Sequence, residues 1–186
     1  MQRAAPWRTI KAVKCLMRGG VIAYPTESVW GLGCDPFNQA AVARILQLKQ
    51  RQVAKGLILV ASDIEQLGEL VADWSIEQRH RLVNEGVTPT TWLIPHHGLI
   101  PQWITGEHSS VALRISTHPV VKALCEGFGG PIVSTSANRA GLPAARNQVR
   151  SRHYFGSKVD SYVAGATGGK ARPSTIIDFE TGNILR

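Results

Sequence analysis

Three cations lie within seven residues of each other, between a predicted helix and a predicted strand. They are Lys49, Arg51 and Lys55. A guanidinium presents a planar fork to phosphate oxygens and an ammonium acts as a point charge, so the cluster has the charge needed to bind a triphosphate. Cations at the C-terminus of a helix also offset its dipole. Taken alone, the cluster leaves phosphate binding and helix stabilisation as alternatives.

Hydroxyls and a carboxylate follow the first predicted strand, in residues 24–28 (Tyr-Pro-Thr-Glu-Ser). Ligands of α/β sheets gather beyond the carboxyl ends of strands, so this segment lies where a binding site is expected. A proline-initiated turn that satisfies its own hydrogen bonds is the alternative.

Two further polar segments flank predicted strands. Residues 134–138 (Ser-Thr-Ser-Ala-Asn) follow one strand, and short side chains let backbone N–H groups approach an anion closely. Before the last strand, Gly168 and Gly169 permit a tight backbone, and Arg172 and Ser174 after them would face a phosphate. A simple turn at the first segment and a flexible connection at the second are the alternatives.

Several common catalytic patterns are absent from the sequence. It has no Walker A motif, no G-x-G-x-x-G after a strand and no nucleophile elbow. Cys15, Cys34 and Cys125 match no zinc or disulfide spacing, which is typical of a reducing cytosol. The pair at residues 96–97 (His-His) has no metal-ligand partners at useful spacing. We therefore predict neither covalent catalysis nor a metal held by protein side chains.

The location predicted from the sequence is the cytoplasm. No apolar run approaches 18 residues, so no membrane partner is expected. No apolar segment of a secretory signal precedes the first helical pattern.

The charge is strongly basic, with 21 Lys and Arg against 13 Asp and Glu, a net charge of +8 and a pI near 9.9. From residue 139 to 172 there are seven basic residues and one acid, and from 36 to 62 there are four and none. Such acid-poor stretches indicate an anionic partner: nucleotide phosphates, RNA, or both. A merely basic surface is the alternative.

Apolar periodicity predicts one α+β domain over residues 1–186, in which helices and strands alternate. We expect a twisted mixed sheet with helices on both faces, because the strands are continuous apolar runs separated by helices. A turn at 181–183 suggests some antiparallel pairing, and capping boxes at Ser62 and Ser75 would open two more helices. Residues 141–169 are the best candidate for a mobile loop region. The expected helices are 7–17, 40–50 and 119–128, and the expected strands are 21–24, 57–60, 91–94, 111–115, 131–134 and 175–179.

Together, residues 21–27, the three cations, residues 134–138 and residues 173–176 resemble the motifs of the YrdC/Sua5 family, in order and at similar spacing. The chain looks like the short form of that family. The resemblance implies a YrdC/RibB-like fold around a positively charged cavity. It also implies a threonylcarbamoyl-AMP synthase, a nucleotidyltransferase that converts L-threonine, bicarbonate and ATP, with Mg²⁺, into threonylcarbamoyl-AMP and pyrophosphate. Partner proteins would then modify tRNA at the adenosine of position 37, next to the anticodon.

The resemblance also assigns roles to individual residues. It implies that Lys49 and Arg51, the proposed catalytic cations, hold phosphates or the carbamate together with Arg172. The threonine would lie near Thr26, Lys55, Thr91 and Arg114. The ATP-binding set would be Lys49, Arg51, Ser134, Ser136, Asn138, Arg172 and Ser174.

The sequence departs from the family pattern in two places. Residues 86–89 (Gly-Val-Thr-Pro) replace a Trp-Pro-Gly-Pro stretch, which puts the shape of the threonine end, and Thr91 in particular, in doubt. Gly56 stands where the family usually has Pro, which predicts a looser loop after Lys55. Neither change removes a charge that the reaction needs.

Two other functions remain as alternatives. A non-enzymatic RNA-binding module in tRNA or ribosome maturation would account for the charge, although the sequence lacks clustered aromatics for base stacking. A different ATP-dependent adenylating enzyme on the same scaffold is the second.

Overall fold

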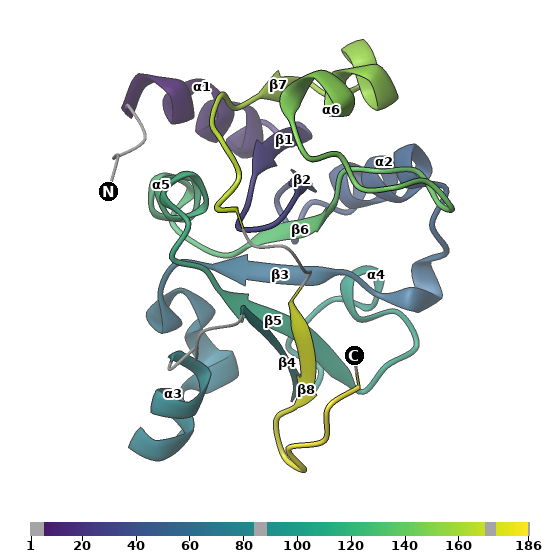
Figure 1. Cartoon of the computed structure of the whole chain (residues 1–186). Coiled ribbons are helices and arrows are strands. Elements are labelled where there is room, and N and C mark those ends of the chain that lie inside the picture. The colour runs from purple at the N-terminus through teal and green to yellow at the C-terminus, as the bar shows by residue number, and fades with distance from the viewer. Residues whose placement is uncertain (1–5, 84–88, 170–173, 186) are drawn as a thin grey trace.

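One mixed sheet of eight strands organises the chain (Figure 1). The computed structural model describes residues 6–83, 89–169 and 174–185. The strands are β1 (Ile22–Pro25), β2 (Trp30–Gly33), β3 (Ile58–Ala61), β4 (Thr90–Pro95), β5 (Ser110–Ile115), β6 (Ile132–Ser136), β7 (Ser161–Tyr162) and β8 (Thr175–Asp178). They are ordered β7-β1-β2-β6-β3-β5-β4-β8 across the sheet.

Parallel and antiparallel pairs are interspersed along this order. The pairs β1–β7, β3–β5 and β4–β8 are parallel. The pairs β1–β2, β2–β6, β3–β6 and β4–β5 are antiparallel. The mixed sheet predicted from the sequence is therefore confirmed.

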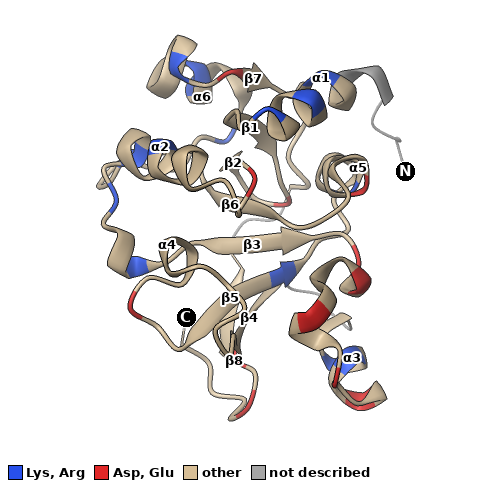
Figure 2. Cartoon of the chain, turned by 180° about the vertical axis from the view of Figure 1, so that it is seen from behind, with Lys and Arg blue, Asp and Glu red and all other residues tan. Residues whose placement is uncertain are grey.

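Helices cover both faces of the sheet, as predicted. The α-helices of the described residues are α1 (Pro6–Met17), α2 (Gln39–Lys49), α3 (Ile76–Val83), α4 (Gln102–Thr105), α5 (Pro119–Phe128) and α6 (Gln148–Phe155). On one face, α1 and α5 enclose a core that includes Leu16, Tyr24 and Leu124. The larger core on the other face receives Ile45 from α2 and Ile104 from α4, two helices that Figure 2 shows from that side.

Three short 3₁₀ helices complete the described elements: η1 (Val53–Lys55), η2 (Ile64–Val71) and η3 (Gly156–Lys158). The capping box predicted at Ser75 is confirmed, because Ser75 Oγ accepts a hydrogen bond from the Gln78 N–H and Gln78 Oε1 accepts one from the Ser75 N–H. The one predicted at Ser62 is wrong by a residue: Asp63 caps η2, accepting from the Glu65 N–H at 3.0 Å.

The segment 141–169, expected to be a loop region, contains α6 and β7 instead. Its apolar pattern is weak because α6 buries Tyr154 and Phe155 only at its end, while Val149 is 78% exposed. The helix is set by its N-cap, since Asn147 Oδ1 accepts from the Arg150 N–H at 2.8 Å.

β2 was also missed, because its sequence Trp-Gly-Leu-Gly resembles a loop. The glycines are needed for close packing in the sheet. A Cβ on Gly33 would lie 2.6 Å from the Val133 carbonyl oxygen and 2.8 Å from the Tyr24 ring. The turn at 181–183 is followed by a single antiparallel bridge, Ile177 with Ile184, whereas β8 itself runs parallel to β4.

In the described part of the chain, no helix combines the length and apolarity needed to cross a membrane.

Candidate functional site

A cavity of about 500 Å³ opens on the sheet face that carries α1 and α5, beyond the part these helices cover. Strand alternation explains its lining. On β4 and β5, Trp92, Val111 and Leu113 point into the larger core. The intervening Thr91 and Arg114 line the cavity. The other predicted site residues in the lining are Thr26, Arg51, Lys55, Ser134, Ser136 and Ser174.

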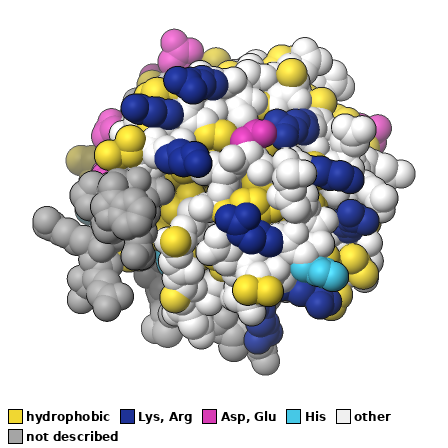
Figure 3. Space-filling model, turned by 90° about the horizontal axis from the view of Figure 1, so that it is seen from above, with side chains coloured by type: hydrophobic (Ala, Val, Ile, Leu, Met, Phe, Trp, Pro, Cys, Tyr) yellow, Lys and Arg dark blue, Asp and Glu magenta, His cyan; other side chains and the backbone are white. Residues whose placement is uncertain are grey.

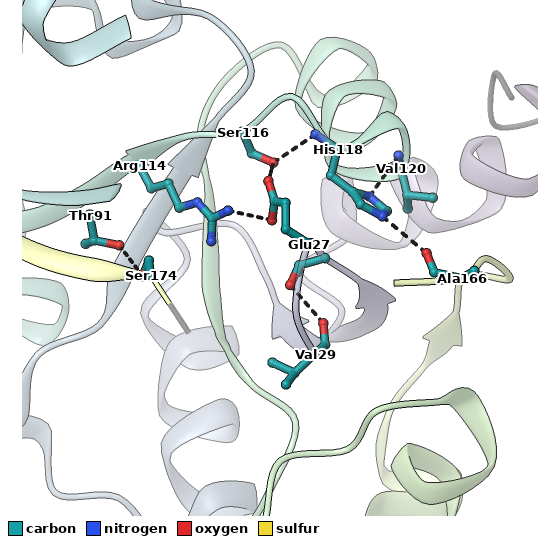
Figure 4. A network of polar contacts seen from close by, with 10 residues as sticks. Glu27, Val29, Thr91, Arg114, Ser116, His118, Val120, Ala166 and Ser174 are labelled. Atoms are coloured by element: carbon teal, nitrogen blue, oxygen red, sulfur yellow. Dashed lines mark hydrogen bonds and ion pairs between the residues drawn. The ribbon is translucent and has the colours of Figure 1, made fainter. Parts of the chain in front are cut away.

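An ion pair lies inside this cavity (Figure 4). Arg114 Nη2 is 2.7 Å from Glu27 Oε2, and the two side chains are only 13% and 12% exposed. Ser116 Oγ donates a hydrogen bond of 2.6 Å to Glu27 Oε1. The carboxylate therefore fixes where the guanidinium lies, and Ser116 fixes the carboxylate. From the sequence, Glu27 was part of a predicted motif but had no role, and Ser116 was not identified. The reason is that Glu27 and Ser116 pair between segments that are far apart in the sequence.

His118 is a third residue of this network that the sequence did not single out. It caps α5, with Nδ1 accepting from the Val120 N–H at 3.3 Å. Its Nε2 lies 3.2 Å from the Ala166 carbonyl oxygen. Burial lowers the pKa of His118, an effect that the nearby Glu27 opposes. His118 thus joins α5 to the segment before Gly168. Gly168 packs closely against the backbone of Glu27, because a Cβ added to this glycine would lie 3.0 Å from Glu27 Cα.

Hydroxyls occupy two other parts of the cavity wall. Thr91 Oγ1 and Ser174 Oγ are 2.7 Å apart, where β8 lies beside β4 (Figure 4). Thr26 Oγ1 donates to the Val29 carbonyl at 2.8 Å, so the turn predicted after β1 is present and lies at the cavity. The ligand-binding and turn interpretations of this segment are therefore compatible.

Lys49 is buried, at 5% exposure, and contacts the loop after β6 without lining the cavity. Its Nζ donates to the Ser136 carbonyl, and to the Asn138 carbonyl at 3.0 Å. Ser136 Oγ in turn donates to Asn138 Oδ1 at 2.6 Å. Burial, with a smaller effect from Arg51, lowers the pKa of Lys49 to about 8. In this structure Lys49 and Asn138 shape the loop after β6, while Ser134 and Ser136 line the cavity.

Arg51 and Lys55 line the cavity from the turn between α2 and β3. Arg51 Nε and Nη2 donate to the Gly56 carbonyl at 3.1 and 3.0 Å, and Nη2 also donates to the Lys55 carbonyl at 3.0 Å. Burial lowers the pKa of Arg51. Gly56 has φ +58°, which proline cannot adopt, and a Cβ there would lie 2.9 Å from the Thr105 carbonyl oxygen. The loop after Lys55 is thus held by Arg51 and by close packing, contrary to the looser loop predicted from Gly56.

Two predicted features lie outside the described residues. They are Arg172 and most of the altered stretch 86–89. Among the described residues, no group of three or more His, Cys, Asp or Glu side chains is placed to hold a metal ion. The carboxylate in the cavity, Glu27, is paired with Arg114.

The site combines cations, hydroxyls and one paired carboxylate in a concave space of ligand size. The buried thiols nearby are poor nucleophiles, because burial raises the pKa of Cys34 and raises that of Cys125 to about 12. The fold and site therefore define a protein that binds an anionic ligand and acts on it by positioning and charge.

The family model described as telomere recombination, Sua5/YciO/YrdC, matches residues 14–186. The chain therefore belongs to the Sua5/YciO/YrdC family, as its motifs predicted. It is 55% identical over 184 residues to threonylcarbamoyl-AMP synthase of Saccharophagus degradans, covering 99% of this chain and 96% of that one. It is 50% identical over 180 residues to the synthase of Stutzerimonas stutzeri, covering 97% of each chain.

Solved structures agree with the fold. A variant of P. abyssi Sua5 matches with a TM-score of 0.91 at 29% identity, covering 100% of this chain and 57% of that one. P. abyssi Sua5 complexed with L-threonine matches with a TM-score of 0.85 at 30% identity, covering 95% and 52%. The chain thus spans little more than half the length of Sua5.

Proposed function

We propose that the chain is a threonylcarbamoyl-AMP synthase that uses L-threonine, bicarbonate and ATP. The observation that carries the proposal is the cavity in which Arg51 and Lys55 from one turn and the Glu27-held Arg114 converge with the hydroxyls of Thr91 and Ser174. Relatives that bear this enzyme name at 50–55% identity over nearly the whole chain support it.

The reaction requires no protein nucleophile. Bicarbonate takes up a proton and loses water to give CO₂. The neutral amine of threonine adds to the carbon of CO₂ and releases a proton, which leaves a carbamate. A carbamate oxygen attacks the α-phosphorus of ATP, the bond between that phosphorus and the bridging oxygen to the β-phosphorus breaks, and pyrophosphate leaves. Charge builds up on phosphate oxygens during this step, so preorganised cations at the site lower the barrier.

We also propose individual roles. Arg114, held by Glu27, would bind the carboxylate of threonine, with Thr26, Thr91 and Lys55 in the same cavity lining. Arg51 would bind phosphates, and Ser134, Ser136 and Ser174 would line the nucleotide. Lys49 and Asn138 would support the loop that carries Ser136. Arg172 would add a further phosphate contact.

Mg²⁺ would enter with ATP, bound by its phosphates. The described residues offer one carboxylate in the cavity, already paired with Arg114, so they do not form a dedicated Mg²⁺ site. Magnesium bound to nucleotide phosphates retains several waters and needs few protein ligands.

The product is a reactive mixed anhydride, so the proposed pathway passes it to partner proteins that modify the adenosine at position 37 of tRNA. We place the protein in the cytoplasm, where ATP, threonine and tRNA are available. Its three cysteines are free, which suits a reducing compartment.

Pyrophosphate release from ATP and bicarbonate, with and without L-threonine, tests the proposal. We expect release that depends on L-threonine and is lost with D-threonine. Release with other amino acids would indicate a different adenylating enzyme. If the protein neither bound ATP nor released pyrophosphate, the RNA-binding module would be favoured. Lys49→Ala or Arg51→Ala proteins that fold and keep full activity would remove these residues from the mechanism.

A further inference from the structure

A short segment after β7 lies against the turn that carries Glu27, and we call this segment, residues 163–168, the strap. Figure 1 shows it in yellow-green, running from β7 towards β8. Its sequence is Val-Ala-Gly-Ala-Thr-Gly, without a charged side chain. The face of the molecule at β7, where the strap begins, is by contrast rich in Lys and Arg (Figure 3). The position of the strap therefore depends mainly on contacts of its backbone.

The strap packs directly on the turn after β1. The Gly168 N–H donates a hydrogen bond of 3.0 Å to the Thr26 carbonyl. Two glycines allow the close approach, because they have no Cβ. A Cβ on Gly165 would lie 2.9 Å from Pro25 Cγ, and one on Gly168 would lie 3.0 Å from Glu27 Cα. The backbone of Thr26 and Glu27, which line the cavity, is thus in contact with the strap.

His118 binds the middle of the strap (Figure 4). The histidine is 7% exposed, whereas Ala166 in the strap is exposed. Its Nδ1 accepts a hydrogen bond from the Val120 N–H, so the proton of the neutral ring is on Nε2. Nε2 then donates to the Ala166 carbonyl at 3.2 Å. Two backbone groups therefore select a single neutral tautomer of His118.

The main chain of His118 contacts the same site from its other side. The His118 N–H donates to Ser116 Oγ at 3.3 Å, and Ser116 Oγ donates to Glu27 Oε1 at 2.6 Å. Glu27 Oε2 is 2.7 Å from Arg114 Nη2. The backbone of Glu27 is thus held through the strap and its carboxylate through Ser116, and both sets of contacts meet at His118. A substitution of His118 removes only the first, because the main-chain N–H remains.

We propose that His118 is a positioning residue for threonine. Its ring holds the strap on the backbone of Glu27, so that the carboxylate keeps Arg114 in place for the carboxylate of the substrate. His118 does not line the cavity and acts through these residues alone. The inference rests on the proposed function, since it concerns the threonine end of that cavity. A role limited to capping α5 is the alternative.

Two substitutions separate the strap from the cap. His118→Asn keeps the cap, because an asparagine side-chain oxygen accepts from the first turn of a helix, but its side chain is too short to bind Ala166. His118→Ala loses both contacts. We expect the KM for threonine to rise about fivefold in both variants, as for the loss of one hydrogen bond, with kcat and the KM for ATP little changed. Urea unfolding should show a lower midpoint for His118→Ala than for His118→Asn, because only the alanine variant lacks the cap.

Two further measurements test the route through Glu27. In the double variant His118→Asn/Glu27→Gln, the KM for threonine should be no higher than in Glu27→Gln alone, because both changes act on Arg114. Amide hydrogen exchange at Gly168 reports on the strap without any reaction, and it should be faster in both His118 variants.

A wild-type KM for threonine in His118→Asn, with a raised one in His118→Ala, would assign the effect to the cap and overturn the inference. Multiplied losses in the double variant, or unchanged exchange at Gly168, would also overturn it. Failure of the proposed function looks different. The wild type would then release no pyrophosphate in response to threonine, whereas exchange at Gly168 would still show whether His118 holds the strap.

Discussion

We expect Glu27 to act on threonine binding through Arg114, which would separate it from a residue that merely stabilises the fold. Glu27→Gln keeps the shape and the bond from Ser116 but leaves the guanidinium without its charge partner. We expect the KM for threonine to rise at least about tenfold and the KM for ATP to change little. Removing one partner of a buried pair costs about 3 kcal/mol of stability.

Glu126→Gln is the matched control. Glu126 pairs with Lys122 at 3.5 Å on α5, where both side chains are more than half exposed. Exposed pairs contribute about 0–1 kcal/mol, so we expect near wild-type stability and kinetics. Equal rises in both KM values of Glu27→Gln would contradict the positioning role.

We expect Lys49 to make ATP binding depend on pH. Its pKa is lowered to about 8 by burial, so it is charged below that pH and neutral above it. Loss of the charge weakens the bonds to the loop of Ser136 and Asn138. We expect the Kd for ATP, measured by calorimetry, to rise several-fold between pH 7 and 9. Lys49→Arg keeps its charge throughout this range and is expected to lack the rise; an identical rise there would contradict this role.

At the scale of elements, the turn after α2 directs two cations to different places. Gln50 has φ 54° and ψ 45°, a left-handed conformation that ends α2. The Gln50 N–H bonds to the Gln47 carbonyl and the Arg51 N–H to the Leu46 carbonyl, as in a Schellman motif. This reversal sends Lys49 behind the loop after β6 and Arg51 into the cavity.

Gln50→Gly should therefore stabilise the protein by about 0.5–1 kcal/mol, because glycine adopts positive φ without the steric cost of a Cβ. The same change at Gln52, where φ is −66°, should destabilise it by a similar amount, because there glycine only adds freedom to the unfolded chain. Urea unfolding of both variants measures the difference. If the two variants changed the free energy of unfolding in the same direction, strain in the left-handed turn at Gln50 would be contradicted.

Much of the architecture was predictable from the sequence, because apolar runs mark strands such as β3, where Ile58–Ala61 is wholly apolar. β2 and α6 were not predictable. In β2 glycines stand where neighbouring groups approach closely, and in α6 the helix begins at its N-cap Asn147, so neither segment shows an apolar periodicity. The site shows the same limit. Cations and hydroxyls beside strands were recognised from their types, but the pairing of Glu27 with Arg114 depends on how distant strands meet.

At the scale of the whole molecule, the cavity exists because α1 and α5 cover only part of one sheet face. Where they pack, Ile22, Tyr24 and Val60 form a closed core. Beyond them, the same face carries Thr91 and Arg114 and remains open. The closed part of the structure holds buried groups whose ionisation limits stability at high pH.

Burial raises the pKa of Tyr24, Cys34 and Cys125, and lowers that of Lys49. The thiols ionise from pH 9.0 in the unfolded chain and Tyr24 from 10.0, but all three stay protonated in the fold, so each lowers stability above those values. Lys49 acts oppositely between about 8 and 10.5, because there only the unfolded chain holds its proton.

Stability should therefore fall as the pH rises above 9, since the raised pKa values of the three thiols, Cys15 included, outweigh the opposite effect of Lys49. Above pH 10 Tyr24 makes this fall steeper. Urea unfolding under reducing conditions across this range measures it. Tyr24→Phe loses a hydrogen bond of 3.3 Å to the Val133 carbonyl at every pH, but should lack the steepening above 10. A slope there equal to the wild type's would mean that the buried tyrosine does not drive alkaline unfolding.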